Sequence, residues 1–204
     1  MRKLTAGFFI SLDGVVADPQ DWHFPYFDDA MGEAVTAQLG GADTLLLGRV
    51  TYDSFAGAWP ERENAGGDDA GMAKALGDAR KIVVTHQDPD FTWRNSEKLR
   101  GDLVEAVDAL KREPGETGIA ISGSPSVVRQ LLAAGLIDEL HLLVHPLTVG
   151  KGARLFEDGQ SIPLRLLSAT PFPSGVVHAI YGPAEAPAAA GYDEARTHLA
   201  QGDR

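Results

Sequence analysis

A strand, a tight turn and a helix follow one another within residues 118–132. Residues 119–121 are short and apolar, which predicts a buried strand. Gly123 accepts a positive φ and places no Cβ between the backbone and a ligand. Ser124 is a favourable N-cap residue, and Pro125 suits the first position of a helix. The helix that follows has an apolar face, formed by Val127, Val128, Leu131 and Leu132.

This turn directs free N–H groups and the positive end of a helix dipole outward, which suits a phosphate or pyrophosphate. It contains one glycine, so it is not the G-x-G-x-x-G dinucleotide fingerprint. An ordinary, well-capped connection explains the same residues equally well. A second strand-to-helix turn at Gly48 favours the phosphate interpretation, because Arg49 adds a charge and Thr51 adds a hydroxyl donor.

The rest of the chain predicts strands alternating with helices. Strands are expected at residues 3–12, 43–47, 80–85 and 137–149, with a closing antiparallel pair at 162–170 and 175–181. Helices are expected at residues 27–39, after Gly48, at 99–110 and after Ser124. Residues 61–71 are polar and glycine-rich, and we expect a mobile surface loop there. The pattern indicates an α/β fold with a predominantly parallel sheet.

Composition limits the class of protein. The length of 204 residues suits one domain, expected at residues 1–183, with an alanine-rich, flexible tail at 184–204. The absence of cysteine excludes disulfides, thiolate zinc sites and cysteine nucleophiles. The net charge of −11 disfavours nucleic acid and anionic membranes as partners. No apolar run resembles a secretory signal or a membrane span, so we expect a cytoplasmic protein.

Two histidines four residues apart, His141 and His145, would suggest a metal pair on a helix. Pro146 and the β-branched neighbours favour a strand instead. On a strand the two residues lie about 13 Å apart, too far to share an ion. We therefore predict no metal site there.

Three predicted strands end in small or hydroxylic residues, at Gly48, Thr85 and Gly123. Ligands of open α/β sheets bind at the carboxyl ends of the strands. An extended cofactor with several phosphates, such as a dinucleotide, fits three such ends. With no G-x-S-x-G elbow and no metal cluster in the sequence, hydride transfer is the expected chemistry.

The chain resembles the dihydrofolate reductase superfamily, and within it the C-terminal reductase domain of the bifunctional riboflavin-biosynthesis deaminase/reductase and its stand-alone relatives. The segments that carry the resemblance are Ser11-Leu12-Asp13-Gly14, Leu46-Leu47-Gly48-Arg49-Val50-Thr51-Tyr52, Ile121-Ser122-Gly123-Ser124, Asp138-Glu139-Leu140-His141-Leu142 and Gly150-Lys151-Gly152. They span residues 1–181 in the order of the family. The deaminase signature, H-x-E with P-C-x-x-C, is absent, so deamination is excluded.

The resemblance implies a dihydrofolate reductase-like, three-layer α/β/α fold with a mixed, mostly parallel sheet and an antiparallel C-terminal hairpin. It also implies a homodimer and NADPH as the hydride donor. The cofactor residues that it implies are Gly48, Arg49 and Thr51 at the adenosine-side phosphates, Thr85 and His86 near the 2′-phosphate, Ser122, Gly123, Ser124, Ser126 and Val127 at the pyrophosphate, and Ala6, Val16 and Ala17 near the nicotinamide.

The predicted substrate side is acidic. Residues 11–41 contain no lysine or arginine but hold Asp13, Asp18, Asp21, Asp28, Asp29 and Glu33. These negative charges would repel the negative charge of a phosphorylated substrate. We assign Asp28 or Asp29 as the catalytic carboxylate, with helix capping as the alternative for each. Asp13, Trp22 and Phe24 are expected to contact the substrate.

The sequence thus predicts an NADPH-dependent reductase of a small nitrogen heterocycle, similar to 5-amino-6-(5-phosphoribosylamino)uracil reductase. A dihydrofolate reductase is the alternative enzyme. A non-catalytic nucleotide or metabolite binder on the same fold is the alternative of another class.

Overall fold

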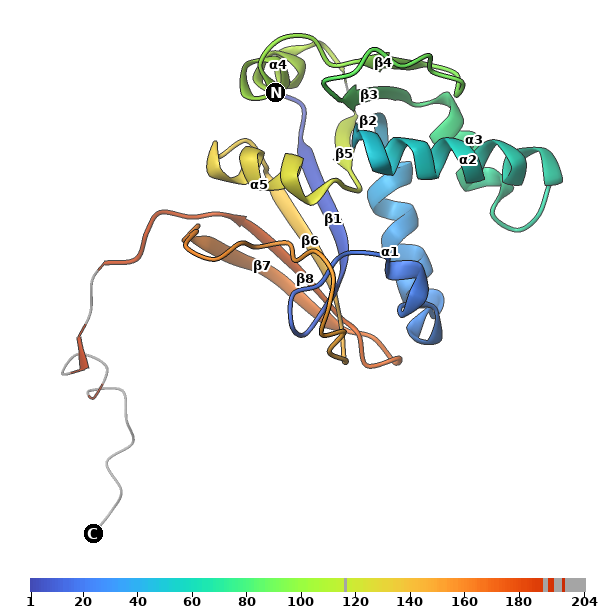
Figure 1. Ribbon diagram of the computed structural model, residues 1–204. Helices are drawn as coiled ribbons and strands as arrows, with labels where there is room; N and C mark the ends of the chain where they lie inside the picture. Colours follow the sequence, from blue (N-terminus) through green and yellow to red (C-terminus); the bar gives the residue numbers. More distant parts are fainter. Residues whose placement is uncertain (116, 189–190, 193–195, 197–204) are drawn as a thin grey trace.

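A single eight-stranded sheet forms the centre of the protein in a computed structural model that describes residues 1–115, 117–188, 191, 192 and 196 (Figure 1). The strands are β1 (Leu4–Ser11), β2 (Ala42–Gly48), β3 (Arg80–Val84), β4 (Ser96–Lys98), β5 (Gly118–Ile121), β6 (Glu139–His145), β7 (Leu164–Pro171) and β8 (Val177–Pro183). The helices are α1 (Asp29–Gly40), α2 (Arg49–Ala65), α3 (Ala70–Asp78), α4 (Leu103–Arg112) and α5 (Pro125–Ala133). Most of the predicted tail, 184–204, lies outside the described residues.

The strand order is β4-β3-β2-β5-β1-β6-β8-β7. Strands β1 to β6 run parallel to their neighbours, while β8 is antiparallel to both β6 and β7. The predicted α/β class, the mostly parallel sheet and the antiparallel C-terminal pair are therefore confirmed. Because the parallel strands end at one edge of the sheet, the turns that follow them lie together.

Helices cover both faces of the sheet, and alternation along the strands assigns the side chains to each face. Leu46 of β2 packs in the core cluster that contains the buried residues of α4 and α5. Its neighbours Leu45 and Leu47 pack in the cluster that contains Tyr52 of α2 and Leu76 of α3. A smaller cluster joins Met31 of α1 to β6. The result is a three-layer α/β/α arrangement.

The expectation of a mobile loop at residues 61–71 is wrong. Helix α2 continues through Pro60 to Ala65, and α3 begins at Ala70. The polar residues that suggested a loop lie on exposed turns of α2, where Arg62 pairs with Asp69. Strand β4 and helix α3 were not predicted, because β4 consists of three polar residues and α3 begins within the glycine-rich stretch that predicted a loop. The helix expected at 27–39 begins at Asp29, and the helix expected at 99–110 begins at Leu103.

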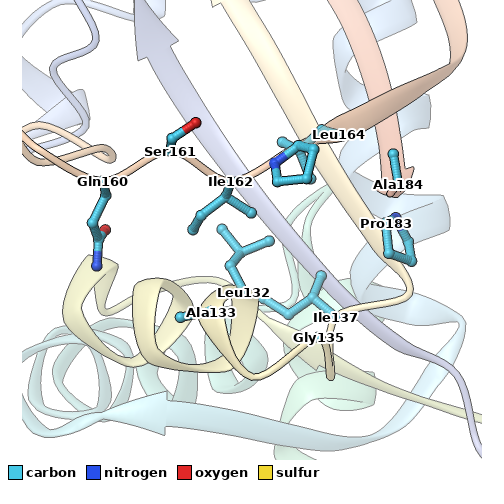
Figure 2. A pocket seen from close by; sticks show the side chains of 11 residues that line it. Leu132, Ala133, Gly135, Ile137, Gln160, Ser161, Ile162, Leu164, Pro183 and Ala184 are labelled. Atoms are coloured by element: carbon cyan, nitrogen blue, oxygen red, sulfur yellow. The ribbon is translucent and has the colours of Figure 1, made fainter. Parts of the chain in front are cut away.

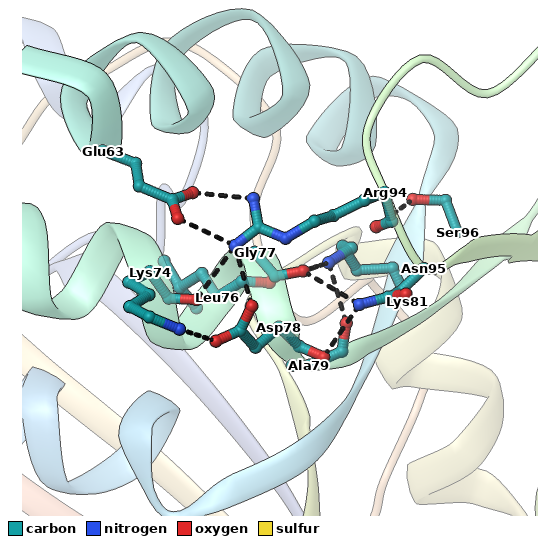
Figure 3. Close-up of polar contacts among 10 residues, drawn as sticks. All are labelled: Glu63, Lys74, Leu76, Gly77, Asp78, Ala79, Lys81, Arg94, Asn95 and Ser96. Carbon is teal, nitrogen blue, oxygen red and sulfur yellow. Dashed lines mark hydrogen bonds and ion pairs between the residues drawn. The ribbon is translucent and has the colours of Figure 1, made fainter.

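Lys81 of β3 fixes the end of α3 against the sheet (Figure 3). Its buried ammonium donates hydrogen bonds to the carbonyl oxygens of Leu76, Gly77 and Ala79, at 2.7–2.8 Å. The ammonium also lies 4.2 Å from the ring centroid of Trp93. These contacts satisfy carbonyls that a helix leaves without partners at its C-terminus. None of the helices described is both long and apolar enough to cross a membrane.

Candidate functional site

The carboxyl ends of β3, β2 and β5 lie side by side, as the sequence predicted. Gly48, the last residue of β2, is level with Val84 of β3. Its N–H donates to the carbonyl oxygen of Gly123, at 3.3 Å. Thr85 follows β3 directly, so Gly48, Thr85 and Gly123 occupy one edge of the sheet.

The two glycine turns touch so closely that side chains would not fit between them. A Cβ on Gly48 would lie 2.5 Å from the Cβ of Ser124. Gly123 has a φ of +115°, and a Cβ there would lie 2.7 Å from Oγ1 of Thr51. Glycine at both positions therefore lets the first turn of α2 approach the first turn of α5.

Two helix N-termini meet at this contact. Neither N-cap residue, Gly48 for α2 or Ser124 for α5, caps the backbone N–H groups of its helix with a side chain. The Ser124 hydroxyl instead lies 2.7 Å from the hydroxyl of Ser126, which is exposed. Val127 is buried and its N–H donates to the Ser124 carbonyl, so it supports the turn from within. Two uncapped helix N-termini form a favourable site for a phosphate.

Arg49 extends from this contact toward the end of β3. Its Nε donates to both carboxylate oxygens of Asp53, at 2.8 and 2.7 Å. Its Nη1 donates to Oε1 of Gln87, at 3.3 Å. The Thr85 hydroxyl accepts a hydrogen bond from the Gln87 N–H, at 3.1 Å, and His86 between them is exposed. The guanidinium and the segment after β3 therefore form one polar surface.

Further cations near this edge were not predicted. Strand β4 is parallel to β3 and ends at Lys98, so Lys98 and Arg100 lie at the same edge of the sheet as the end of β3. Lys98 donates to Asp88, at 2.7 Å, and the charges of Lys98 and Arg100 help to lower the pKa of that carboxyl. Gln87 was also missed. Strand β4 is too short to be predicted from the sequence, so residues 98–100 could not be placed at this edge of the sheet.

The ends of β1 and β6 form the other half of the edge, and Asp13 joins them. Its carboxylate accepts hydrogen bonds from the Ser11 hydroxyl and from the N–H groups of Val149 and Gly150, at 2.6–3.0 Å. These donors, the Ser11 hydroxyl first, lower the pKa of Asp13 to about 2. Asp13 is thus a structural junction between two loops, with its carboxylate already engaged.

Two of the three residues expected near the nicotinamide, Val16 and Ala17, lie next to this junction. The N–H of Val16 donates to the Ala153 carbonyl, at 2.9 Å. The Ala17 carbonyl accepts a hydrogen bond from Nε1 of Trp22, at 3.1 Å. Ala6 is fully buried and level with Ile121, the last residue of β5. Ser122 connects β5 to Gly123 and is partly buried.

Asp28 and Asp29 differ in their surroundings. Asp28 is the N-cap of α1: one carboxylate oxygen accepts from the Met31 N–H, at 2.9 Å, and the other from the Ser174 N–H, at 3.0 Å. These hydrogen bonds, that of Met31 first, lower the pKa of Asp28. The capping interpretation therefore holds for Asp28. Asp29 lies in the first turn of α1 and is exposed.

Trp22 and Phe24 belong to residues 17–27, which we call the aromatic loop. Trp22 is buried and packs edge-on against His145, with ring centroids 5.1 Å apart. Phe24 is 61% exposed and lies 4.2 Å from the ring of His23. His23 and His145, which are both buried, were not assigned to the site from the sequence. His23 lies between aromatic residues in the sequence, and His145 was considered only as half of a metal pair.

A cavity of about 390 Å³ lies elsewhere, between α5, the N-terminal end of β7 and the C-terminal end of β8 (Figure 2). Its walls are mainly apolar and include Leu132, Ile137, Ile162 and Leu164. It contains none of the predicted site residues. The edge of the sheet formed by the carboxyl ends of the parallel strands, here called the carboxyl edge, remains the place where the predicted phosphate-binding residues meet.

Comparison with known proteins identifies the family. Residues 2–178 match the RibD C-terminal domain. The chain is 28% identical over 184 residues to the uncharacterized protein YyaP of Bacillus subtilis, covering 88% of this chain and 94% of that protein. It is 25% identical over 163 residues to the uncharacterized protein YwjB of the same organism, covering 77% and 84%.

Solved structures share the fold. A protein of Shewanella sp. PV-4, provisionally described as a riboflavin biosynthesis protein, has a TM-score of 0.69 and 19% identity, covering 91% of this chain and all of that one. A pyrimidine reductase-like protein of Corynebacterium diphtheriae has a TM-score of 0.60 and 20% identity, covering 91% and 93%. Dihydrofolate reductase of Enterococcus faecalis, complexed with NADP(H) and RAB-propyl, has a TM-score of 0.56 and 20% identity, covering 88% and 93%. The fold is thus dihydrofolate reductase-like, and the chain belongs to the RibD C-terminal domain family, a family of reductase-like proteins.

Proposed function

We propose that this protein is an NADPH-dependent reductase of a small nitrogen heterocycle. The observation that carries the proposal is the contact between the N-termini of α2 and α5, where Gly48 and Gly123 leave room for no side chain. Helix N-termini bind phosphate through their free N–H groups and dipoles. Arg49 supplies a guanidinium at the same edge. The family membership and the NADP(H) complex of the Enterococcus dihydrofolate reductase support this assignment.

The residues present fit a dinucleotide that carries a pyrophosphate and a further phosphate on its adenosine ribose. Ser124, Ser126 and the first amides of α5 would donate to the pyrophosphate. Arg49, with Thr85 and Gln87 beside it, would hold the phosphate of the adenosine ribose, and the ion pair with Asp53 would weaken as the phosphate binds. When bound, the cofactor supplies a hydride from its nicotinamide ring. The chain's own part is to orient that ring near Val16 and Ala17.

The substrate side supports an uncharged or cationic ring. Asp13 and Asp28 are ionised over most of the pH range because their carboxylates accept hydrogen bonds from backbone N–H groups. Asp29 is exposed and is the more available of the two helix carboxylates for a ring nitrogen. A phosphorylated substrate, as in riboflavin biosynthesis, would need Arg154 or Lys151 to offset this acidic field.

Cofactor binding is tested by thermal shift with NADPH and NADH. A ligand that binds only the folded state raises the melting temperature by mass action. We expect a larger shift with NADPH, and we expect Arg49→Ala to remove the difference between the two cofactors. Arg62→Ala is the matched control, because Arg62 lies on the same helix but pairs with Asp69 away from the edge. Equal shifts for both cofactors in the wild type would contradict the assigned role of Arg49.

Activity is tested by following NADPH oxidation with a panel of aminopyrimidines and dihydropterins, dihydrofolate included. Asp29→Asn is expected to lower kcat by about 10²-fold or more, the usual loss when a general acid is removed. Asp28→Asn is expected to act mainly on stability. Tight NADPH binding without turnover of any compound would favour the non-catalytic binder. Turnover of dihydrofolate alone would favour a dihydrofolate reductase.

A further inference from the structure

Two buried imidazoles connect the aromatic loop to the sheet. His23 of the loop is 6% exposed, and His145, the last residue of β6, is 0% exposed. Their ring centroids lie 6.2 Å apart, with the planes at 84°. Phe9 of β1 stacks on His23 with centroids 4.3 Å apart. The pair therefore forms the centre of the contact that holds the loop over the ends of β1 and β6.

Hydrogen bonding fixes which nitrogen of neutral His145 carries the proton. Its Nδ1 lies 2.8 Å from the carbonyl oxygen of Leu143, so Nδ1 carries the proton and Nε2 is an unprotonated acceptor. Within the described part of the chain, Nε2 of His145 and Nδ1 of His23 are buried without hydrogen-bond partners. A proton added to Nδ1 of His23 would create a buried cationic N–H with no acceptor, which is strongly unfavourable. For His145 the backbone of Leu143 and of Ile10 favours the protonated ring, but burial has the larger effect and lowers its pKa.

The neighbouring groups offer no counter-ion. Trp22 and Tyr26 of the loop pack edge-on against His145, at 5.1 and 5.6 Å. The acidic groups on the adjoining elements, Asp13 after β1 and Asp28 before α1, bond to backbone N–H groups instead. The other charged or titratable groups around this end are Asp18, Asp21, Asp29, Lys151 and Arg154, all exposed, and His141 and His178 on β6 and β8.

We propose that His23 and His145 form an acid-sensitive latch: both rings are neutral while the aromatic loop is closed, and protonation releases the loop from the sheet. This device is independent of the proposed function, because it rests on the packing of the loop alone. It would regulate access to the end of the sheet formed by β1 and β6, which the loop covers.

The direction of the pH dependence follows from burial. Burial lowers the pKa of His23 to about 4, with a smaller contribution from the neighbouring His145, and burial also lowers the pKa of His145. In the released loop both rings would titrate near the ordinary value of about 6.5. The closed loop is therefore favoured above about pH 6.5. As the pH decreases toward 4, the equilibrium constant for closing the loop falls by up to about tenfold per pH unit for each histidine.

A second histidine pair provides a control. His141 and His178 lie 3.2 Å apart through Nδ1 and Nε2, and the other nitrogen of His141 lies 3.1 Å from a carboxylate oxygen of Glu139. A proton on His141 therefore has an acidic partner, and this pair lies outside the aromatic loop. His141→Gln should leave the release of the loop unchanged.

The test is ¹⁹F NMR of protein labelled with 5-fluorotryptophan, from pH 7 to pH 3.5. The resonance of Trp22, assigned with Trp22→Phe, should move to a solvent-exposed position in the acid range, while those of Trp59 and Trp93 stay in place. His145→Phe and His23→Phe keep an aromatic ring but cannot be protonated, so each should shift the midpoint of the Trp22 transition to lower pH by at least half a unit.

Several outcomes would overturn the latch. Movement of all three tryptophan resonances together in the wild type would show global acid unfolding and no separate release. An unchanged Trp22 resonance down to pH 3.5 in folded wild-type protein would show that protonation does not open the loop. An identical Trp22 transition in the wild type, His145→Phe and His23→Phe would exclude the two histidines as its cause. The first two outcomes require only the wild-type protein.

Discussion

Asp13 shows what a single residue contributes and what the sequence hides. The Asp13-Gly14 turn was visible in the sequence, and a substrate contact was assigned to it. In the structure the carboxylate accepts from the N–H groups of Val149 and Gly150, which lie 136 and 137 residues away in the chain. No local pattern indicates a partner at that distance, so the joining of two loops could not be predicted.

Asp13→Asn should weaken this junction. The folded-state pKa of Asp13 is lowered from 3.8 to about 2, so its stabilising contribution is complete above pH 3.8 and is lost as the pH falls toward 2. Urea unfolding at pH 6 should show a lower midpoint for Asp13→Asn than for the wild type, and the difference should shrink by pH 3. Asp158→Asn, at an exposed position, is the control. A difference that stays constant with pH would contradict this account.

Asp28 and Asp29 can be separated by stability. Asp28→Ala removes the N-cap of α1 and its hydrogen bond to Ser174. We predict a decrease in melting temperature of roughly 2–4 °C, as expected for a lost cap in a domain of this size. Asp29→Ala, one residue later and exposed, should change the melting temperature by less than about 1 °C. Equal decreases in melting temperature for the two substitutions would show that the Asp28 side chain does not stabilise α1 as its N-cap.

At the scale of elements, the sequence predicted segments with a clear apolar run or period and missed those without one. Residues 119–121 and the apolar face of α5 were predicted because strand and helix periods are both evident there. Strand β4 has three residues and gains its place only by pairing with β3. Helix α2 passes through a proline and a polar stretch because it is held by tertiary contacts, such as the pairing of Glu63 with Arg94.

Gly57 within α2 and Gly48 at its N-cap provide a matched pair of substitutions. Gly57 lies within the helix, with no atom within 4 Å of an added Cβ, so Gly57→Ala should stabilise the protein by about 0.5–1 kcal/mol. Gly48→Ala places a Cβ 2.5 Å from that of Ser124 and should separate the two helix N-termini. We expect it to lower stability and to remove the thermal shift with NADPH. Chemical denaturation of both variants checks the prediction, which fails if Gly48→Ala is as stable as Gly57→Ala.

Lys81 is predicted to be essential to the α3–β3 contact. Burial lowers the pKa of Lys81 to about 8, so the ammonium still carries its proton at pH 7 and donates to the carbonyl groups at the end of α3. Lys81→Met keeps the apolar stem but leaves those buried carbonyls without a donor. We expect a loss of about 3 kcal/mol in the free energy of unfolding, measured by urea denaturation. Lys74→Met, at an exposed ion pair, should cost less than about 1 kcal/mol.

At the scale of the whole molecule, β7 is a free edge of the sheet. It has one neighbour, β8, among the described strands, and Leu166 and Leu167 are 53% and 42% exposed. Exposed edge strands readily pair with another chain. The antiparallel pair that contains β7 was predicted from two strand-like segments on either side of Pro171-Phe172-Pro173-Ser174, whereas the homodimer came from family resemblance alone. We propose that β7 pairs with β7 of a second copy across a twofold axis.

Analytical ultracentrifugation tests this proposal. The wild type should sediment as a dimer at micromolar concentration, and Leu166→Lys should raise the dissociation constant at least tenfold. Val104→Lys, at an exposed position on α4, should leave it unchanged. A wild type that is monomeric at every concentration, or two variants with equal dissociation constants, would refute a dimer formed through β7.

The most direct test of the account is a ¹⁵N NMR titration of the protein with NADPH. The account predicts chemical-shift changes concentrated in the amides of residues 48–51 and 123–127, at the joined N-termini of α2 and α5. The amides around the distant cavity, at residues 132–137, should not move. Shifts confined to that cavity, or no binding at millimolar NADPH, would contradict the claim that the carboxyl edge of the sheet is the cofactor site.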